Sequence, residues 1–290
     1  MTWVQGLRHG AALHPRRAAM VILGLFVLVM TLPVLILGTE DLTNGTGTLD
    51  FETLTGGLPW QIILTTALLG GVWLLGWWRL TLLRSQLDRR GLRPLYATLA
   101  YPLLGMIVFT AFLREQDSAH SPLSVLGLVL ALNFFVGLSE ELLFRGIIFG
   151  ALRQKNRLIT AIFVSSIAFG ALHLVNAGVG QGLQQTLFQI INATALGVLF
   201  CGLTLSANSL WPAIVLHMIW NSYAMMGVAS AEVLGEVPGA PVEPPDLSPW
   251  SLTLPALILL IAMAILYGYR LNAGIRFRDV VPGPKANHPI

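Results

Sequence analysis

Residues 133–150 read Asn-Phe-Phe-Val-Gly-Leu-Ser-Glu-Glu-Leu-Leu-Phe-Arg-Gly-Ile-Ile-Phe-Gly and place three charged side chains in an otherwise apolar run. The charged residues are Glu140, Glu141 and Arg145. At the centre of a bilayer, each such charge costs about 2.5–3.5 kcal/mol on insertion scales. A membrane-spanning helix therefore keeps charges only where they pair, line a water-filled cavity or take part in chemistry.

Helical geometry separates the three charges. Glu141 and Arg145 are four residues apart, so they lie on one face of a helix and can form an ion pair. Glu140 is rotated by about 100° from Glu141 and by about 140° from Arg145. We predict that Glu141 and Arg145 form a structural pair and that Glu140 is the working carboxylate. The alternative at this point is that all three line a transport path through the membrane.

The composition is that of a membrane protein. Of the 290 residues, 55% are hydrophobic and 11% are charged, whereas soluble domains carry about 25% charged residues. We predict an all-α, polytopic membrane helix bundle that forms a single integral membrane domain over residues 1–290, because lipid offers no partner for an open backbone. About eight apolar runs are long enough to span a bilayer: 18–38, 58–78, 95–113, 122–152, 158–175, 183–205, 209–228 and 251–269.

The distribution of basic residues predicts the topology. Cytoplasmic segments are enriched in Lys and Arg, and eight alternating spans with the N-terminus inside put 15 of the 17 basic residues on that side. We therefore expect a multi-pass protein of the plasma (inner) membrane with both termini in the cytoplasm. The charges behind the net charge of +3 lie at the ends of the apolar runs and are a topology signal, so no nucleic-acid partner is expected. The basic segment 79–94 is expected to form a short amphipathic helix at the inner surface.

Two histidines occur inside other apolar runs. His173 follows Phe169 by four residues, and His217 precedes Asn221 by four residues, so each pair shares a helix face. A single histidine on an apolar helix is most often a core residue with a satisfied hydrogen bond. Two histidines at about the depth of Glu140, counted at about 1.5 Å per residue from the cytoplasmic ends, are better explained by a common site.

Glu140, His173, His217 and Asn221 together offer the groups that amide hydrolysis requires. A carboxylate can take a proton from water, an imidazole can orient that water, and a second imidazole and an amide can donate to the oxyanion. The same groups could instead bind a metal such as Zn²⁺, and the candidate ligands are then Glu140, His173 and His217. The sequence has no Gly-x-Ser-x-Gly elbow and no His-Glu-x-x-His zinc motif.

Three motifs, in order on three predicted helices, resemble the CPBP intramembrane proteases, a family that includes CAAX prenyl endopeptidases and bacterial proteins linked to bacteriocin self-immunity. They are Glu140-Glu141-x-x-x-Arg145, Phe169-x-x-x-His173 and His217-x-x-x-Asn221. The resemblance covers residues 118–228, which we expect to be the peptidase core. It implies that Glu140 and His173 activate the attacking water and that His217 and Asn221 stabilise the oxyanion. The remaining motif residues are implied to be supporting.

We therefore predict an intramembrane endopeptidase that hydrolyses a peptide bond of a membrane-associated or lipidated protein or peptide, with membrane lipids as its other partners. Two alternatives stay open: a proton-coupled transporter, and a non-catalytic immunity or scaffold protein whose charges only hold helices together. A water activated by Glu140 is favoured over zinc. The reason is that Glu141 is expected to be committed to Arg145, which leaves no acid to orient either imidazole.

Overall fold

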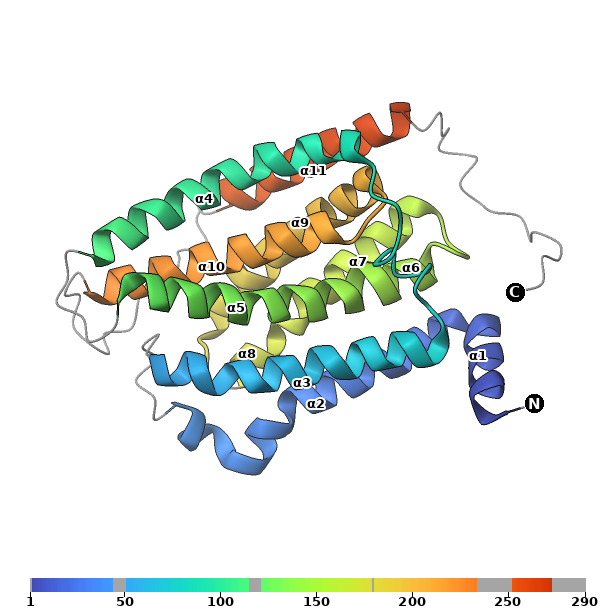
Figure 1. Cartoon of the computed structure of the whole chain (residues 1–290), viewed down its shortest axis with the longest axis horizontal. Helices are drawn as coiled ribbons and strands as arrows, with labels where there is room; N and C mark the ends of the chain where they lie inside the picture. Colours follow the sequence, from blue (N-terminus) through green and yellow to red (C-terminus); the bar gives the residue numbers. More distant parts are fainter. Residues whose placement is uncertain (1, 44–50, 115–120, 179, 234–251, 273–290) are drawn as a thin grey trace.

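The structure is a computed structural model, and the residues that it describes are 2–43, 51–114, 121–178, 180–233 and 252–272. In these ranges the regular elements are all helices. The longer helices form a bundle, and α1 (Trp3–Leu13) stands across one of its ends (Figure 1). The other helices are α2 (Pro15–Thr43), α3 (Phe51–Leu75), η1 (Arg89–Leu92), α4 (Arg93–Leu113), α5 (Pro122–Glu141), η2 (Leu142–Ile148), α6 (Phe149–Leu152), α7 (Leu158–Leu172), α8 (Leu174–Gly178), α9 (Leu183–Ala207), α10 (Trp211–Val233) and α11 (Thr253–Asn272).

Each apolar run that was predicted to span the membrane contains a helix. Within the described ranges, six helical stretches are long and apolar enough to cross a membrane, and α11 carries a shorter apolar stretch, Thr253–Tyr269. The six are Pro15–Leu32, Leu54–Leu75, Arg89–Phe112, Pro122–Leu152, Leu158–Gly178 and Leu183–Ala207. The protein is thus an all-helical, multi-pass membrane protein. The count of eight spans and the cytoplasmic position of both termini stay predictions.

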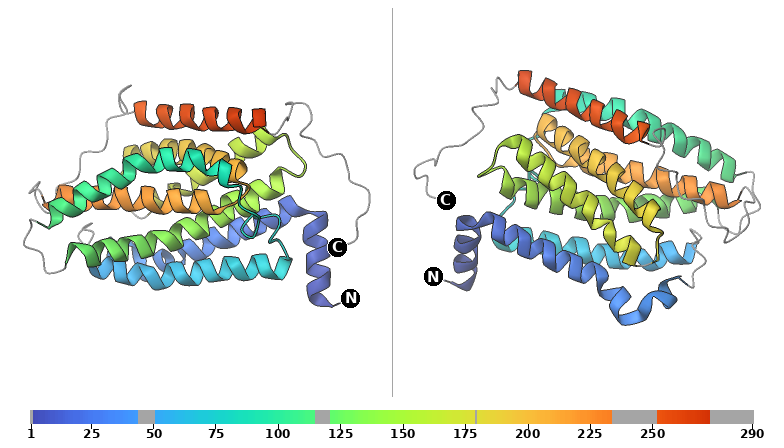
Figure 2. Two further views of the ribbon diagram at one scale, coloured as in Figure 1. Left: turned by 45° about the horizontal axis from the view of Figure 1, so that its top comes forward. Right: turned by 180° about the vertical axis from the view of Figure 1, so that it is seen from behind.

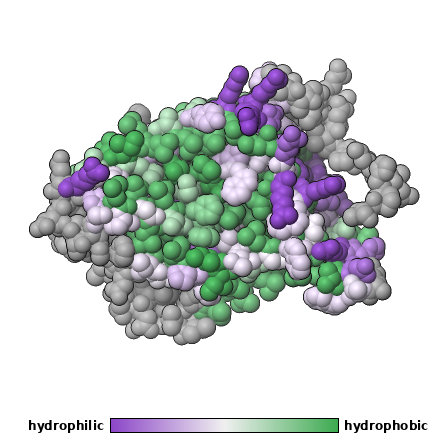
Figure 3. Space-filling view, viewed as in Figure 1, coloured by the Kyte–Doolittle hydropathy of each residue, from purple (hydrophilic) through white to green (hydrophobic). Residues whose placement is uncertain are grey.

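The surface of the bundle agrees with a lipid environment. Apolar residues cover its flank, and polar residues gather at the end where α1 lies (Figure 3). Large apolar side chains on the outer helices are exposed, among them Leu104 and Ile107 of α4 and Leu260 of α11. A continuous exposed apolar surface of this kind is typical of a protein that contacts lipid.

Helix α9 is the centre of the bundle. Of its span, 72% is buried, compared with 17–39% for the other candidate spans. It contacts α7, α10 and α11, and Figure 2 shows the bundle around it from two further directions. Its C-terminus is formed by Asn208 in the left-handed conformation, with φ of 50°, a backbone state that asparagine tolerates better than most residues.

Helices α7 and α9 approach closely at two glycines. A Cβ atom on Gly170 would overlap Thr194 Oγ1 and lie 2.7 Å from the carbonyl oxygen of Ile190. A Cβ atom on Gly197 would lie 2.8 Å from the Cβ of Ser166. Neither position can carry a side chain without separating the helices, so both glycines are required for this contact.

The predicted run 122–152 is helical throughout, but the type of helix changes along it. Ser121 caps α5 by accepting from the Ser124 backbone N–H, with Pro122 at the first helical position. The helix then changes to the wider π form, η2, before it continues as α6. The Ser165 hydroxyl donates to the carbonyl oxygen of Phe144 in this π segment at 2.7 Å. Such π segments inside α-helices are frequent at functional sites.

The expectation of an amphipathic helix over 79–94 is wrong. The chain there forms consecutive turns and then the four-residue 3₁₀-helix η1. Its backbone also bonds to a distant part of the molecule: the Asp88 N–H donates to Ala207 O at 2.9 Å, and the Leu210 N–H donates to Leu82 O at 3.3 Å. The periodicity of the segment could not reveal these distant partners.

Candidate active site

Glu141 joins α5, η2 and α10 through one oxygen atom. Its Oε1 accepts a hydrogen bond from Arg145 Nη1 at 3.0 Å and lies 2.8 Å from Nδ1 of His217. The carboxylate paired with Arg145 is ionised and has no hydrogen to donate, so His217 Nδ1 is the donor of the second bond. All three side chains are buried, with at most 3% of each residue exposed. The ion pair between Glu141 and Arg145 is present, as the four-residue spacing predicted.

The bond between Glu141 and His217 corrects one step of the sequence-based argument. Glu141 was expected to be committed to Arg145 and to leave no acid that could orient an imidazole. A carboxylate can accept several hydrogen bonds, and Glu141 accepts from both partners at once. The identity of the hydrogen-bonded ring nitrogen fixes which side of an imidazole faces the site. Glu141 therefore orients His217.

Glu140 is the more exposed of the two carboxylates. Its Oε2 lies 3.6 Å from Nε2 of His217, and 11% of its side chain is exposed, compared with 0% for Glu141. A separation of 3.6 Å is longer than a good hydrogen bond. Both atoms can therefore still form a hydrogen bond to a third group. His217 lies between two carboxylates, with one ring nitrogen toward each.

The contact between α5 and α10 depends on a glycine that the sequence-based argument missed. A Cβ atom on Gly137 would lie 3.2 Å from Ile214 O, 3.3 Å from Met218 N and 3.5 Å from His217 Cβ. Gly137 precedes Glu141 by one helical turn and therefore sets how closely α10 approaches the two carboxylates. In the sequence it stands among apolar residues without any motif that marks it.

Aromatic rings surround the buried guanidinium of Arg145. Its Cζ lies 4.1 Å from the ring centroid of Phe169 and 5.0 Å from that of Phe200. The Nε and Nη2 atoms are buried and have no hydrogen-bond partner among the described residues. The two ring faces thus supply favourable electrostatic contact where hydrogen-bond partners are lacking.

Phe200 was not predicted to belong to the site. It stacks on His217 with ring centroids 5.1 Å apart and an interplanar angle of 13°. Phe200 lies on α9, in a run of apolar residues where one phenylalanine carries no signal of its role. Together with the bond to Glu141, this stack fixes the plane of the His217 ring.

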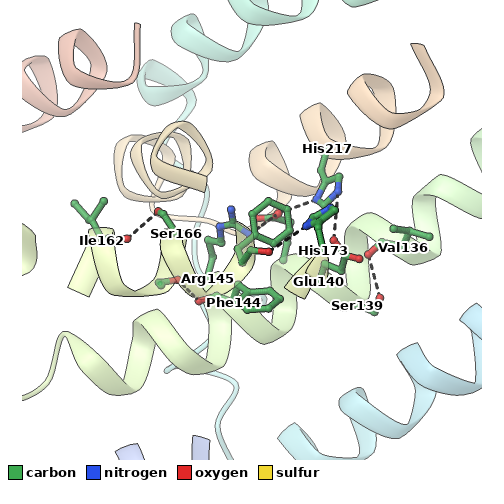
Figure 4. Close-up of polar contacts among 12 residues, drawn as sticks. Val136, Ser139, Glu140, Phe144, Arg145, Ile162, Ser166, His173 and His217 are labelled. Atoms are coloured by element: carbon green, nitrogen blue, oxygen red, sulfur yellow. Dashed lines mark hydrogen bonds and ion pairs between the residues drawn. The ribbon is translucent and has the colours of Figure 1, made fainter. Parts of the chain in front are cut away.

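His173 lies at the edge of the same aromatic group. It caps the C-terminus of α7 and is half-buried, with Nδ1 3.2 Å from Phe169 O. The Phe169 ring contacts His173 edge-on at 5.5 Å and His217 at 5.6 Å. Glu140, His173 and His217 gather in one group in the close-up (Figure 4). The structure thus brings together the two histidines that the sequence predicted.

Asn221 is the predicted site residue that the contacts do not link to the others. It lies one turn after His217 on α10 and is half-buried. Within the described part of the chain, no hydrogen bond joins it to Glu140, His173 or His217. Its participation in the site stays a prediction.

The side chains do not fit the metal alternative. Among the described residues, no group of three or more His, Cys, Asp and Glu side chains is arranged so that it could hold a metal ion. The bonds that His217 and His173 make through Nδ1 leave Nε2 of each ring available, as in a metal-bound histidine, so only the lack of a set of three ligands among the described residues speaks against a metal. We therefore derive no step of the reaction through a metal.

Comparison with known proteins agrees with the motifs. Residues 122–223 match the family described as "Type II CAAX prenyl endopeptidase Rce1-like". The chain is also 28% identical over 159 residues to "Putative membrane peptidase YdiL" of Bacillus subtilis (strain 168). That alignment covers 50% of this chain and 61% of the relative. No solved structure matches the chain.

The matched segment runs from the start of α5 into α10 and contains all three motifs that carried the resemblance. The family prediction made from Glu140, His173 and His217 is therefore confirmed. Residues 122–223 are thus similar to the Rce1-like type II CAAX prenyl endopeptidase family, within the CPBP group.

Proposed function

We propose that the protein is an intramembrane endopeptidase that hydrolyses a peptide bond of a membrane-associated or lipidated protein or peptide. The observation that carries the proposal is the buried pair of Glu140 and His217, 3.6 Å apart on two different helices, with Glu140 in a segment apolar enough to cross a membrane. Charged groups inside such segments are costly and are retained for function. Residues 118–228 are the proposed peptidase core.

Each catalytic step is assigned to a named group. Glu140 takes a proton from water, and the water oxygen adds to the carbonyl carbon of the scissile bond. His217, when both ring nitrogens carry a proton, donates from Nε2 to the oxyanion, because Nδ1 is held by Glu141. The tetrahedral intermediate then loses its C–N bond, and Glu140 returns the proton to the leaving amine.

His173 and Asn221 are the other two catalytic residues in this proposal, and three further residues support them. His173 orients the attacking water from the C-terminus of α7, and Asn221 donates a second hydrogen bond to the oxyanion. The family implies the same division of labour. Glu141 and Arg145 hold His217 in place through the shared Oε1 atom, and Phe169 packs against both imidazoles.

The substrate class follows from the family and from the location of the site. The relative from Bacillus subtilis is named a membrane peptidase, and the family description is that of CAAX prenyl endopeptidases. For this chain we infer a substrate held in the membrane, because Glu140 lies in a stretch of 31 residues that is apolar enough to span a bilayer. The proposed location is the plasma (inner) membrane, with both termini in the cytoplasm.

The test is cleavage of defined peptides by the purified protein in lipid nanodiscs. Two quenched-fluorescent probes are used, one a transmembrane peptide and one with an S-farnesyl cysteine four residues from its C-terminus. Cleavage in H₂¹⁸O should place ¹⁸O in the new carboxyl group, as measured by mass spectrometry. Glu140→Gln should lower kcat by about 10³-fold or more, as expected for loss of a general base.

Thermal unfolding of Glu140→Gln provides the control. The variant should keep the midpoint of the wild-type protein, because Glu140 makes no short hydrogen bond to any other residue that the structure describes. Equal cleavage by Glu140→Gln and wild type would contradict the assigned role. Proton flux through the wild-type protein in liposomes, without any hydrolysis, would instead favour the transporter alternative.

A further inference from the structure

A second polar group lies beside the candidate active site, on the side of His173. The Asn176 N–H donates to His173 O at 3.0 Å, and Asn176 Nδ2 donates to Gln189 Oε1 at 2.9 Å. Gln181 Nε2 donates to the same Gln189 oxygen at 3.1 Å. The amide of Gln189 on α9 is therefore connected to the backbone of His173 through one intermediate residue.

The polar face of α9 continues toward His217. At about 100° per residue, five side chains between Gln185 and Phe200 fall within an arc of about 80° on this helix. They are Gln185, Gln189, Asn192, Leu196 and Phe200. Phe200 is the residue that stacks on His217. The amide side chains therefore lie on the same face of α9 as the ring that contacts the catalytic imidazole. At about 1.5 Å per residue, Asn192 is about 12 Å from Phe200 along the helix axis.

Asn192 is the member of this face with unused hydrogen-bonding capacity. Its Nδ2 donates to Phe188 O, one turn earlier on the same helix, at 3.0 Å. Its Oδ1 is buried and has no hydrogen-bond partner among the described residues. An unpaired buried acceptor is costly, and most such groups in proteins are paired. Within the described ranges Asn192 makes no side-chain hydrogen bond to another helix, so these contacts do not explain why an amide is present.

A substrate inside the membrane brings the partner that Asn192 lacks. A peptide bond in a helix is shielded, so the segment around the scissile bond has to be extended, and its N–H and C=O groups then have no water to bond. An amide side chain can accept from such an N–H and donate to such a C=O. In an apolar environment this makes an amide-bearing face a suitable surface for an unwound backbone.

We propose that Asn192, with Gln189 beside it, forms a subsite for the unwound backbone of the substrate, in which Asn192 Oδ1 accepts a hydrogen bond from a substrate backbone N–H. The inference rests on the proposed peptidase function and extends it to substrate binding. An axial distance of about 12 Å corresponds to about four extended residues. The contacted N–H is therefore about four residues from the scissile bond.

The experiment combines a variant with a backbone scan of the peptide probe that the wild-type protein cleaves. In the scan, each of the six residues on either side of the scissile bond is N-methylated in turn, which removes one N–H. Wild-type kcat/KM should fall about tenfold at one position, the size expected for a single lost hydrogen bond. Asn192→Leu should lower kcat/KM about tenfold on the unmodified peptide. Methylation at that position should then cause no further fall in kcat/KM of this variant.

Asn156→Leu is the matched control. Asn156 is also half-buried and also donates from Nδ2 to the carbonyl oxygen four residues earlier, at 3.0 Å, but it lies after α6 in the loop before α7. It should leave kcat/KM and the methylation profile unchanged. The thermal midpoint of Asn192→Leu should equal or exceed that of the wild type, because the lost acceptor is unpaired in the free protein.

The outcomes separate the two proposals. A lower thermal midpoint of Asn192→Leu with an equal loss on all methylated peptides would assign Asn192 a structural role and overturn the subsite. Unchanged cleavage by Asn192→Leu would also overturn it and leave the peptidase function intact. A wild-type protein that cleaves neither probe would overturn the peptidase function and the subsite with it.

Discussion

Glu141 and His217 are joined across the α5–α10 interface by a hydrogen bond of 2.8 Å between Oε1 and Nδ1. The bond connects two of the three sequence motifs and fixes the ring nitrogen that faces Glu140. The two adjacent carboxylates of the first motif therefore have different tasks. Glu141 positions the imidazole from its buried side, and Glu140 faces it from the accessible side.

The first prediction concerns this bond. Glu141→Gln should lower kcat/KM by about 10²–10⁴-fold, as happens when the acidic partner of a catalytic histidine is neutralised. Because Glu141 acts through His217, the double variant Glu141→Gln/His217→Ala should be hardly worse than His217→Ala alone. The measurement is a double-mutant cycle on kcat/KM. If the fold-loss in kcat/KM of the double variant equals the product of the two single losses, the two residues act independently.

The second prediction concerns the stability of the buried charges. Arg145→Ala leaves Glu141 without its cationic partner and should lower the free energy of unfolding by about 3–5 kcal/mol. Adding Glu141→Gln should restore part of this loss, because the unpaired charge is then removed. Thermal unfolding in detergent gives both values. Arg157→Ala, at an exposed arginine before α7, is the control and should change stability by about 0.5 kcal/mol or less. Full stability of Arg145→Ala would count against the pair.

The third prediction tests the close approach of α5 and α10. Gly137→Val inserts a side chain where backbone atoms of Ile214 and Met218 already lie within 3.3 Å of a Cβ position. It should cost about 1–3 kcal/mol through overpacking and lower activity by moving His217 away from Glu140.

Gly127→Val is the matched control for this substitution. Gly127 lies on the same helix, with no atom within 4 Å of its Cβ position, so its replacement should leave stability and activity close to those of wild type. Equal effects of the two substitutions would show that loss of the helical glycine, and not the approach of α10, causes the change.

The fourth prediction concerns metal. Cleavage of the peptide probe should survive prolonged dialysis against a chelator, because Glu140, His173 and His217 are not arranged as a set of metal ligands. The metal content of the same sample is measured by mass spectrometry before and after dialysis. If dialysis abolishes cleavage and one equivalent of Zn²⁺ restores it, the metal-dependent mechanism is established instead.

The sequence predicted the local features of the site well. The Glu141–Arg145 pair follows from helical spacing alone, because residues four apart on a helix are neighbours whatever surrounds them. The apolar runs predicted the positions of the long helices for the same reason, since each run must satisfy its own backbone in lipid. The family followed from three short motifs in order. Each of these inferences needs only contacts within one helix or along the chain.

Several specific contacts between distant segments were missed. The hydrogen bond between Glu141 and His217 joins residues 76 positions apart, and no spacing rule connects two helices of unknown rotation. Phe200 and Gly137 look like ordinary members of apolar helices, and only packing reveals their contacts with His217. The segment 79–94 was mispredicted because its backbone partners lie near Ala207 and Leu210.

The sequence by itself determined that the chain is a helical membrane protein, that Arg145 neutralises Glu141, and that Glu140 and two histidines are the exceptional residues within its apolar runs. The physical reason is that both the bilayer and the helix impose constraints that act on short stretches of chain. Only the tertiary structure decided that Glu141 also orients His217 and that α9 contributes Phe200 to the site. Those facts depend on how helices rotate and approach one another, which is set by many small packing contacts at once.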